Sequence, residues 1–212
     1  MKKVKMIVLL VGSSTIILLL LFILIITSMY GTLTSSYASN TVEYPEGMNF
    51  VGFPLLCDKY IVTTDFIDDD YNNQFGYYHY AVDLVGYIDD DNTDVPVVTL
   101  YDGVVYSVCE DTSNAGYGVI MYYEQMNIYV LYCHFAYLPV VEVGQELVAG
   151  DILGIQGTTG HSTGIHLHIA FFEGGYGTDY KVDPRDYINL CDKRIWCSPN
   201  ETIESEDIQS DS

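Results

Sequence analysis

Residues 165–172 read IHLHIAFF, and polar and apolar positions alternate through the first half of this stretch. Because successive side chains of a β-strand point to opposite faces, Ile165, Leu167 and Ile169 are predicted to face a core. His166 and His168 then share the other face, with their Cα atoms roughly 7 Å apart. Two imidazoles at this spacing can serve one reaction centre, so the stretch predicts a strand that carries part of the core and part of a site.

The region from residue 50 to 192 has β character throughout. Segments rich in β-branched and aromatic residues are separated at short intervals by Gly and by Asn/Asp clusters. The predicted strands include 95–108, 119–123, 128–132 and 165–172. No amphipathic helical period of useful length occurs, so we expect one compact, mainly β domain with mostly antiparallel strands. The acidic clusters 68–70 and 89–91 are interpreted as solvated loop tips, because the EF-hand calcium spacing is absent.

Four of the five histidines lie in three short motifs. His166 and His168 form one, His79 stands four residues before Asp83, and His134 follows another predicted strand. A catalytic zinc site needs three protein ligands and an open fourth position for water. These five residues exceed that need, so histidine is left over for proton transfer. The pattern therefore favours a catalytic zinc site over a closed structural one.

The local sequence predicts where two of these histidines lie. On a straight strand, His79 and Asp83 would be roughly 13 Å apart, too far to share one ion. We therefore expect His79 on a loop that precedes the strand carrying Asp83. His134 is expected to share a strand face with Tyr132, which could help to orient the site, while Cys133 faces the other way.

The N-terminus combines Lys2, Lys3 and Lys5 with an apolar run from Met6 to about Ile26. At about 1.5 Å per residue, a helix of this length spans a hydrocarbon core of roughly 30 Å. The lysines before it predict an inside N-terminus and an outside C-terminus. We favour a retained anchor, and a cleaved signal peptide is the alternative, because residues 36–38 loosely resemble a cleavage site.

Composition completes the predicted organisation. The chain has a formal net charge of −21, and its part beyond the N-terminal lysines is more acidic still, which excludes nucleic acid as a partner. We expect a transmembrane anchor at 1–28, a linker at 29–49, the domain at 50–192 and a disordered acidic tail at 193–212.

The five cysteines contain no CxxC pair, so a thiolate zinc site is disfavoured. Because the number is odd, at least one thiol has no partner within the chain. Cys191 and Cys197 are close enough in sequence to form a disulfide.

At this point the motifs resemble a known family. HxxxD at 79–83, Tyr-x-His at 132–134 and His-Leu-His at 166–168 are together similar to the lysostaphin-type zinc metalloendopeptidases of bacterial cell walls. Residues 141–154, 157–168 and 182–184 resemble segments that flank the site in that family. The resemblance covers about residues 50–190, essentially the whole predicted domain.

The resemblance implies a β fold of the duplicated hybrid motif type, a compact antiparallel sheet or barrel-sandwich. It implies one Zn²⁺ per chain held by His79, Asp83 and His168, with His134 and His166 as catalytic groups. Which of the two histidines is the base stays open.

The expected function is hydrolysis of amide bonds in peptidoglycan stem peptides or cross-bridges, by an enzyme anchored in the bacterial cell membrane with its domain outside. The alternative is a non-catalytic wall-binding scaffold, or an activator of another hydrolase. Such modules typically lose ligands, and this chain keeps all of them, which favours the enzyme. The sequence carries no signal for the oligomeric state.

Overall fold

The structure, a computed structural model, describes residues 47–199. The predicted anchor at 1–28, nearly all of the predicted linker and the tail beyond residue 199 lie outside the described residues. Within 47–199, no helix has the length and apolar character needed to cross a membrane.

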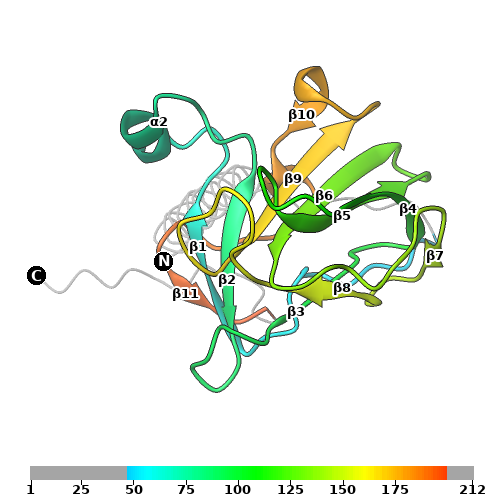
Figure 1. The fold of residues 1–212 in the computed structure, drawn as a ribbon, viewed down its shortest axis with the longest axis horizontal. Helices are drawn as coiled ribbons and strands as arrows, with labels where there is room; N and C mark the ends of the chain where they lie inside the picture. Colours follow the sequence, from blue (N-terminus) through cyan, green and yellow to red (C-terminus); the bar gives the residue numbers. More distant parts are fainter. Residues whose placement is uncertain (1–46, 200–212) are drawn as a thin grey trace, which may run out of the picture. The chain divides into compact units, whose positions relative to one another are not determined.

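Within that range, nine strands form one sheet whose neighbouring strands are all antiparallel (Figure 1). The order across the sheet is β11 (Trp196–Cys197), β1 (Lys59–Thr64), β2 (Val82–Tyr87), β9 (Leu167–Glu173), β6 (Ile128–Phe135), β5 (Tyr117–Tyr123), β4 (Gly103–Cys109) and β7 (Glu146–Leu147). The short β10 (Lys181–Val182) pairs with the distal part of β9. The mainly antiparallel β class that the sequence predicts is therefore confirmed.

A second, two-stranded sheet covers one face of the large one. It consists of β3 (Pro96–Val98) and β8 (Ile152–Ile155). The sequence predicted a single strand over 95–108, and this is wrong. Thr99, Leu100 and Tyr101 leave the β3 ladder, and the chain then enters β4 in the other sheet.

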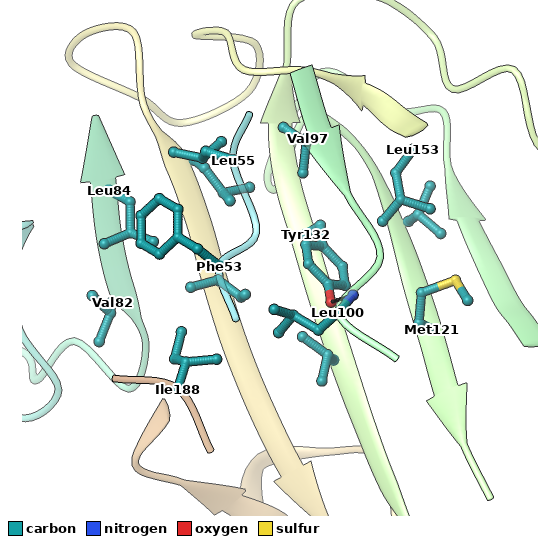
Figure 2. Close-up of a cluster of buried hydrophobic side chains, with 14 of the residues drawn as sticks. Phe53, Leu55, Val82, Leu84, Val97, Leu100, Met121, Tyr132, Leu153 and Ile188 are labelled. Atoms are coloured by element: carbon teal, nitrogen blue, oxygen red, sulfur yellow. Dashed lines mark hydrogen bonds between the residues drawn. The ribbon is translucent and has the colours of Figure 1, made fainter. Parts of the chain in front are cut away.

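The core fills the space between these two sheets. Leu167 and Ile169 point into it from β9, as the alternation predicted, and so does Phe171. Ile165, also expected in the core, is only half-buried, because it precedes the first residue of β9. Figure 2 shows Val97 and Leu153 of the small sheet close to side chains of the large sheet. Because this core occupies one face of β9, the side chain of His168 lies on the opposite face.

Tyr132 belongs to this core and not to the site, contrary to the sequence prediction. It is fully buried, and its hydroxyl accepts a hydrogen bond from the backbone N–H of Leu100 and pairs with the hydroxyl of Tyr123. A buried tyrosine hydroxyl needs such partners. Tyr132 therefore stabilises the packing of β6 against the turn after β3.

A short helix, α2 (Asp69–Phe75), replaces the first of the two predicted acidic loop tips. Asp68 caps its N-terminus, and Gly76 ends it with a positive φ of 82°. Both residues are typical at these positions. Seven residues are too few to show an amphipathic period, which explains why the sequence pattern missed the helix. The second acidic cluster, 89–91, is exposed as predicted.

The C-terminal boundary of the domain lies beyond residue 192, because β11 pairs with β1 inside the segment that the sequence assigned to the tail. Cys191 and Cys197 form the disulfide that their proximity suggested, with Cα atoms 6.5 Å apart. Pro184–Asp186 and Thr178–Tyr180 are single 3-10 turns, η2 and η1, that lead into this segment.

Asp68 links the C-terminal segment to α2. Only 6% of its surface is exposed. Its carboxylate accepts hydrogen bonds from the backbone N–H groups of Asp65 and Tyr71, both at 3.1 Å, and from Lys193 Nζ at 2.7 Å. Burial raises the pKa of Asp68, but these bonds outweigh it and lower the pKa to about 2. The folded protein therefore stabilises the charged form of Asp68.

We expect Asp68→Ala to lower the free energy of unfolding by about 1–2 kcal/mol, because the helix cap and the ion pair are both lost. Asp68→Asn keeps the oxygen that accepts from the Tyr71 N–H. It loses the charge, the ion pair with Lys193 and the oxygen that accepts from the Asp65 N–H. An unfolded Asp has a pKa of about 3.9, so the contribution of the charge is fully present above about pH 5 and disappears as the pH falls toward 2.

Urea unfolding of the wild type and Asp68→Asn between pH 7 and pH 2 measures this contribution. The difference in unfolding free energy should shrink as the solution becomes more acidic. A difference that stayed constant over the whole range would contradict the proposed role of the carboxylate.

Candidate metal centre

Three side chains converge on one point at the exposed face of the large sheet. His79 Nε2 lies 3.1 Å from His168 Nδ1 and 3.2 Å from Asp83 Oδ1, and His168 Nδ1 lies 2.9 Å from Asp83 Oδ1. Ligand atoms of a tetrahedral zinc ion, each about 2.0–2.1 Å from the metal, stand about 3.3 Å apart. Two imidazole nitrogens and one carboxylate oxygen at these separations fit zinc in both spacing and chemistry.

The strand register produces this convergence. Asp83 on β2 is paired directly with His168 on β9, so both side chains leave the sheet on the same face. His79 lies on the loop before β2, as predicted, and this loop folds back so that residues four apart in sequence meet. The bend thus brings together His79 and Asp83, which would be roughly 13 Å apart on a straight strand.

Asp83 is the shared partner of the cluster. Besides its contacts with His79 and His168, its Oδ1 lies 3.6 Å from His166 Nε2. Burial raises the pKa of this carboxyl, but the hydrogen bonds from His168 and His79 outweigh that effect and hold the pKa well below its usual range. Asp83 is therefore an anion in the folded protein, as a metal ligand must be.

His134 and His166 complete the cluster from the other side of His168, and the ring nitrogens of the three histidines lie within 4.8 Å of one another. His134 Nδ1 is 2.8 Å from the carbonyl oxygen of Thr159, and His166 Nδ1 is 2.8 Å from that of Gly164. A carbonyl only accepts, so in each neutral ring Nδ1 carries the proton and Nε2 keeps its lone pair.

The orientation of His134 differs from the sequence prediction. Cys133, paired with His168, and His134 both line the cavity beside the cluster, whereas Tyr132 points into the core. The register of β5 and β6 shifts next to this position, and His134 has a φ of 67°. Such an irregularity breaks the strict alternation of a strand and turns the imidazole onto the face of the site.

The environment of His134 favours the neutral ring. Burial has the largest effect on the pKa of His134, and the nearby His166 and His168 add to it. Together they lower this pKa to about 4. The ring is therefore unprotonated at neutral pH. An unprotonated Nε2 that faces a cavity is able to accept a proton from water or substrate.

Two adjoining hollows meet at the cluster. The first has a volume of about 370 Å³ and is bounded by the five site residues, by α2 and by the loop 161–163. The second, about 450 Å³, extends along β9 away from that loop. Both are lined by His79 and His168. The candidate metal centre therefore lies between the two hollows, which together form one extended surface depression. His161, predicted as an exposed loop residue, is exposed at the border of the first hollow.

A partly buried relay behind His79 was not found from the sequence. His79 Nδ1 lies 3.3 Å from the backbone carbonyl of Asp65, whose carboxylate accepts a 2.8 Å hydrogen bond from Arg185 Nε. Arg185 also donates to the carbonyls of Leu190 at 2.8 Å and Cys191 at 2.9 Å. The arginine thus holds together the loop that orients His79 and the disulfide-bonded segment.

We expect Arg185→Gln to weaken zinc binding by about 10–100-fold, because groups that orient a metal ligand typically contribute this much. Competition with a chromogenic chelator measures the affinity. Arg194→Gln is the matched control, since Arg194 is exposed and contacts only Asp70 among the residues of α2. Equal affinities for the two variants would show that the relay has no influence on His79.

Comparisons with known proteins point to one family. The model of peptidase family M23 matches residues 77–184, about half of the chain, including all five site residues. The solution structure of lysostaphin superposes with a TM-score of 0.52 at 22% identity, covering 67% of this chain and 57% of lysostaphin. The catalytic domain of the prophage-encoded M23 protein EnpA from Enterococcus faecalis, in a mutant form, gives 0.50 at 22% identity, covering 68% of this chain and 95% of that one.

A zinc-containing peptidase from Vibrio cholerae also superposes, with a TM-score of 0.50 at 25% identity, covering 63% of this chain and 38% of that one. The first two similarities establish the shared fold, and the family match extends the relationship to the sequence. The resemblance inferred from the histidine motifs is confirmed: the chain belongs to peptidase family M23.

Proposed function

We propose that this chain is a zinc-dependent endopeptidase that hydrolyses amide bonds in peptidoglycan stem peptides or cross-bridges. The observation that carries the proposal is the meeting of His79, Asp83 and His168 within 3.2 Å, beside two further histidines that face the same hollow. A centre with three ligands leaves a position for water, which is the arrangement of catalytic and not of structural zinc sites.

His79, Asp83 and His168 would hold the metal. Zinc in such a site polarises a carbonyl and makes water more acidic. The depression on both sides of the cluster would hold an extended peptide across the face of the sheet, so that its scissile carbonyl comes to lie at the ligands. Placement of this kind lowers the entropic cost of reaching the transition state.

His134 and His166 would transfer the proton. Each keeps Nε2 free by donating Nδ1–H to a backbone carbonyl, which also fixes the ring. One of them accepts a proton from the attacking water and then delivers it to the leaving amine. The other, after taking up a proton from solvent at Nε2, would donate a hydrogen bond to the oxyanion that develops on the carbonyl oxygen.

We further propose that the enzyme acts at the outer surface of the bacterial cell membrane. This rests on Lys2, Lys3 and Lys5 before the apolar run that ends near Ile26, a pattern that predicts a single span with the domain outside. Protease added to cells with an exposed membrane should then remove the domain and leave the N-terminal stub in the membrane.

Substitutions should separate the two sets of residues. We expect Asp83→Ala and His168→Ala to lose zinc and wall-hydrolysing activity together. His134→Ala should keep about one zinc per chain and lose a factor of about 10²–10⁴ in turnover, as for a general acid–base group. Elemental analysis gives the zinc content, and mass spectrometry of peptides released from purified walls gives the activity and the bond that is cleaved.

Thermal unfolding of each variant controls for loss of the fold. If His134→Ala released the zinc, His134 would be a fourth ligand and the site would be closed to water. In that case the protein would be better described as a wall-binding scaffold. A wild-type protein that carries zinc and releases nothing from walls would lead to the same conclusion.

A further inference from the structure

Four tyrosines form a continuous aromatic surface on β4, β5, β6 and the turn after β9. We name this surface the tyrosine platform; it consists of Tyr106, Tyr122, Tyr129 and Tyr176. Tyr122 and Tyr129 stack with ring centroids 4.5 Å apart. Tyr106 packs edge-on against Tyr129 at 4.9 Å, and Tyr176 lies 6.2–6.3 Å from both Tyr106 and Tyr129. The outer rings remain accessible, with Tyr106 50% and Tyr176 42% exposed.

The platform lies on the same face of the sheet as the candidate metal centre. His168 and Phe172 are four apart on β9, so their side chains share one face. Tyr129 of β6 is paired with Phe172, and Tyr122 of β5 is paired with Tyr129. The side chains of both tyrosines therefore lie on the same face as Phe172 and His168. From His168 to Phe172 the strand advances roughly 13 Å, a distance that about four residues of an extended peptide cover.

The second hollow connects the two regions. Its lining includes His79 and His168 at one end and Phe172 and Tyr176 at the other. Phe172 packs against Tyr176 with ring centroids 4.7 Å apart, so the floor passes without a break from the metal centre to the platform. A substrate bound across the metal centre would therefore continue onto the platform.

The chemistry of the platform favours a neutral sugar. Tyrosines combine a rigid apolar face with a hydroxyl, which suits a sugar ring whose C–H groups lie on its faces and whose hydroxyls lie on its edges. Burial and the neighbouring Tyr122 and Tyr106 raise the pKa of Tyr129, so its hydroxyl is protonated at neutral pH.

Charged occupants fit the platform poorly. Among the described residues that line the second hollow, Lys181 is the one lysine or arginine, and it lies over the Tyr80 ring at 5.0 Å. The chain as a whole has a formal net charge of −21. Anionic wall polymers and anionic lipid surfaces are therefore repelled, whereas an uncharged polysaccharide is not.

We propose that the tyrosine platform binds the glycan strand of peptidoglycan, so that the sugar to which a stem peptide is attached stacks on it while the peptide extends to the metal centre. The direction of the peptide rests on the proposed function, whereas the binding of glycan to the platform does not. The platform would thus select peptides that are still attached to sugar.

The direct test uses peptide-free glycan strands made of N-acetylglucosamine alone. These strands are uncharged, whereas amidase-treated peptidoglycan would expose lactyl carboxylates, and they contain no peptide bond that could be cleaved. Isothermal titration of the full-length protein with these strands should show binding. Tyr106→Ala should weaken it by about three- to tenfold, and Tyr106→Ala/Tyr176→Ala should weaken it further, because stacking contacts are lost. Tyr137→Ala is the control, since Tyr137 is an exposed tyrosine outside the platform and both hollows, and this variant should bind as the wild type does.

Hydrolysis supplies a second, independent measurement. With a glycan-linked stem peptide, the platform variants should raise KM and leave kcat within about twofold. With the same peptide free of sugar, neither parameter should change. If no peptide is hydrolysed but the variants still lose glycan binding, the proposed endopeptidase function is wrong, whereas the proposal that the platform binds glycan is supported.

Two results would overturn the platform proposal. One is a wild-type protein that does not bind the peptide-free strands, or variants that bind them as tightly as the wild type. The other is a change from dimer to monomer in the platform variants, measured by sedimentation, with glycan binding unaffected. The tyrosines would then form an interface between two copies of the chain.

Discussion

The carboxylate of Asp83 is the point on which the rest of the site depends. It is buried, it is charged, and it faces three histidines from two different segments of the chain. A buried anion without partners would be strongly unfavourable, so the fold must bring donors or a metal to it. The pairing of β2 with β9 places His168 directly opposite, and the loop before β2 supplies His79. The same constraint makes the site a suitable place for a cation.

The large sheet separates stability from function by its two faces. One face packs against the sheet of β3 and β8 and forms the core, in which the side chains of Leu167, Ile169 and Phe171 are fully buried. The other face carries the metal centre and, roughly 13 Å further along β9, the tyrosine platform. Because a shift of one residue in register would exchange the two faces, the apolar pattern of β9 also fixes the position of His168.

The C-terminal segment supports the site from behind. Arg185 connects the loop that orients His79 with the carbonyls beside Cys191, and Lys193 connects α2 with the same segment through Asp68 and Asp70. The disulfide between Cys191 and Cys197 closes this segment, and β11 attaches it to the edge of the sheet. Residues distant in sequence from the candidate metal ligands thereby hold the wall of the first hollow in place.

The sequence by itself determined the β class, the alternation of β9 and the five residues that the structure brings together at the candidate metal centre. These follow from local periodicity and from the chemistry of histidine and aspartate, and the motif spacing was enough to identify the family. The face of His134 and the burial of Tyr132 were predicted wrongly, because a register shift and a positive φ depend on the neighbouring strand β5. Arg185 and Asp65 are 120 residues apart, and the platform tyrosines come from different strands among 20 tyrosines in the chain. Only tertiary packing brings such residues together, since no local pattern encodes a contact between strands.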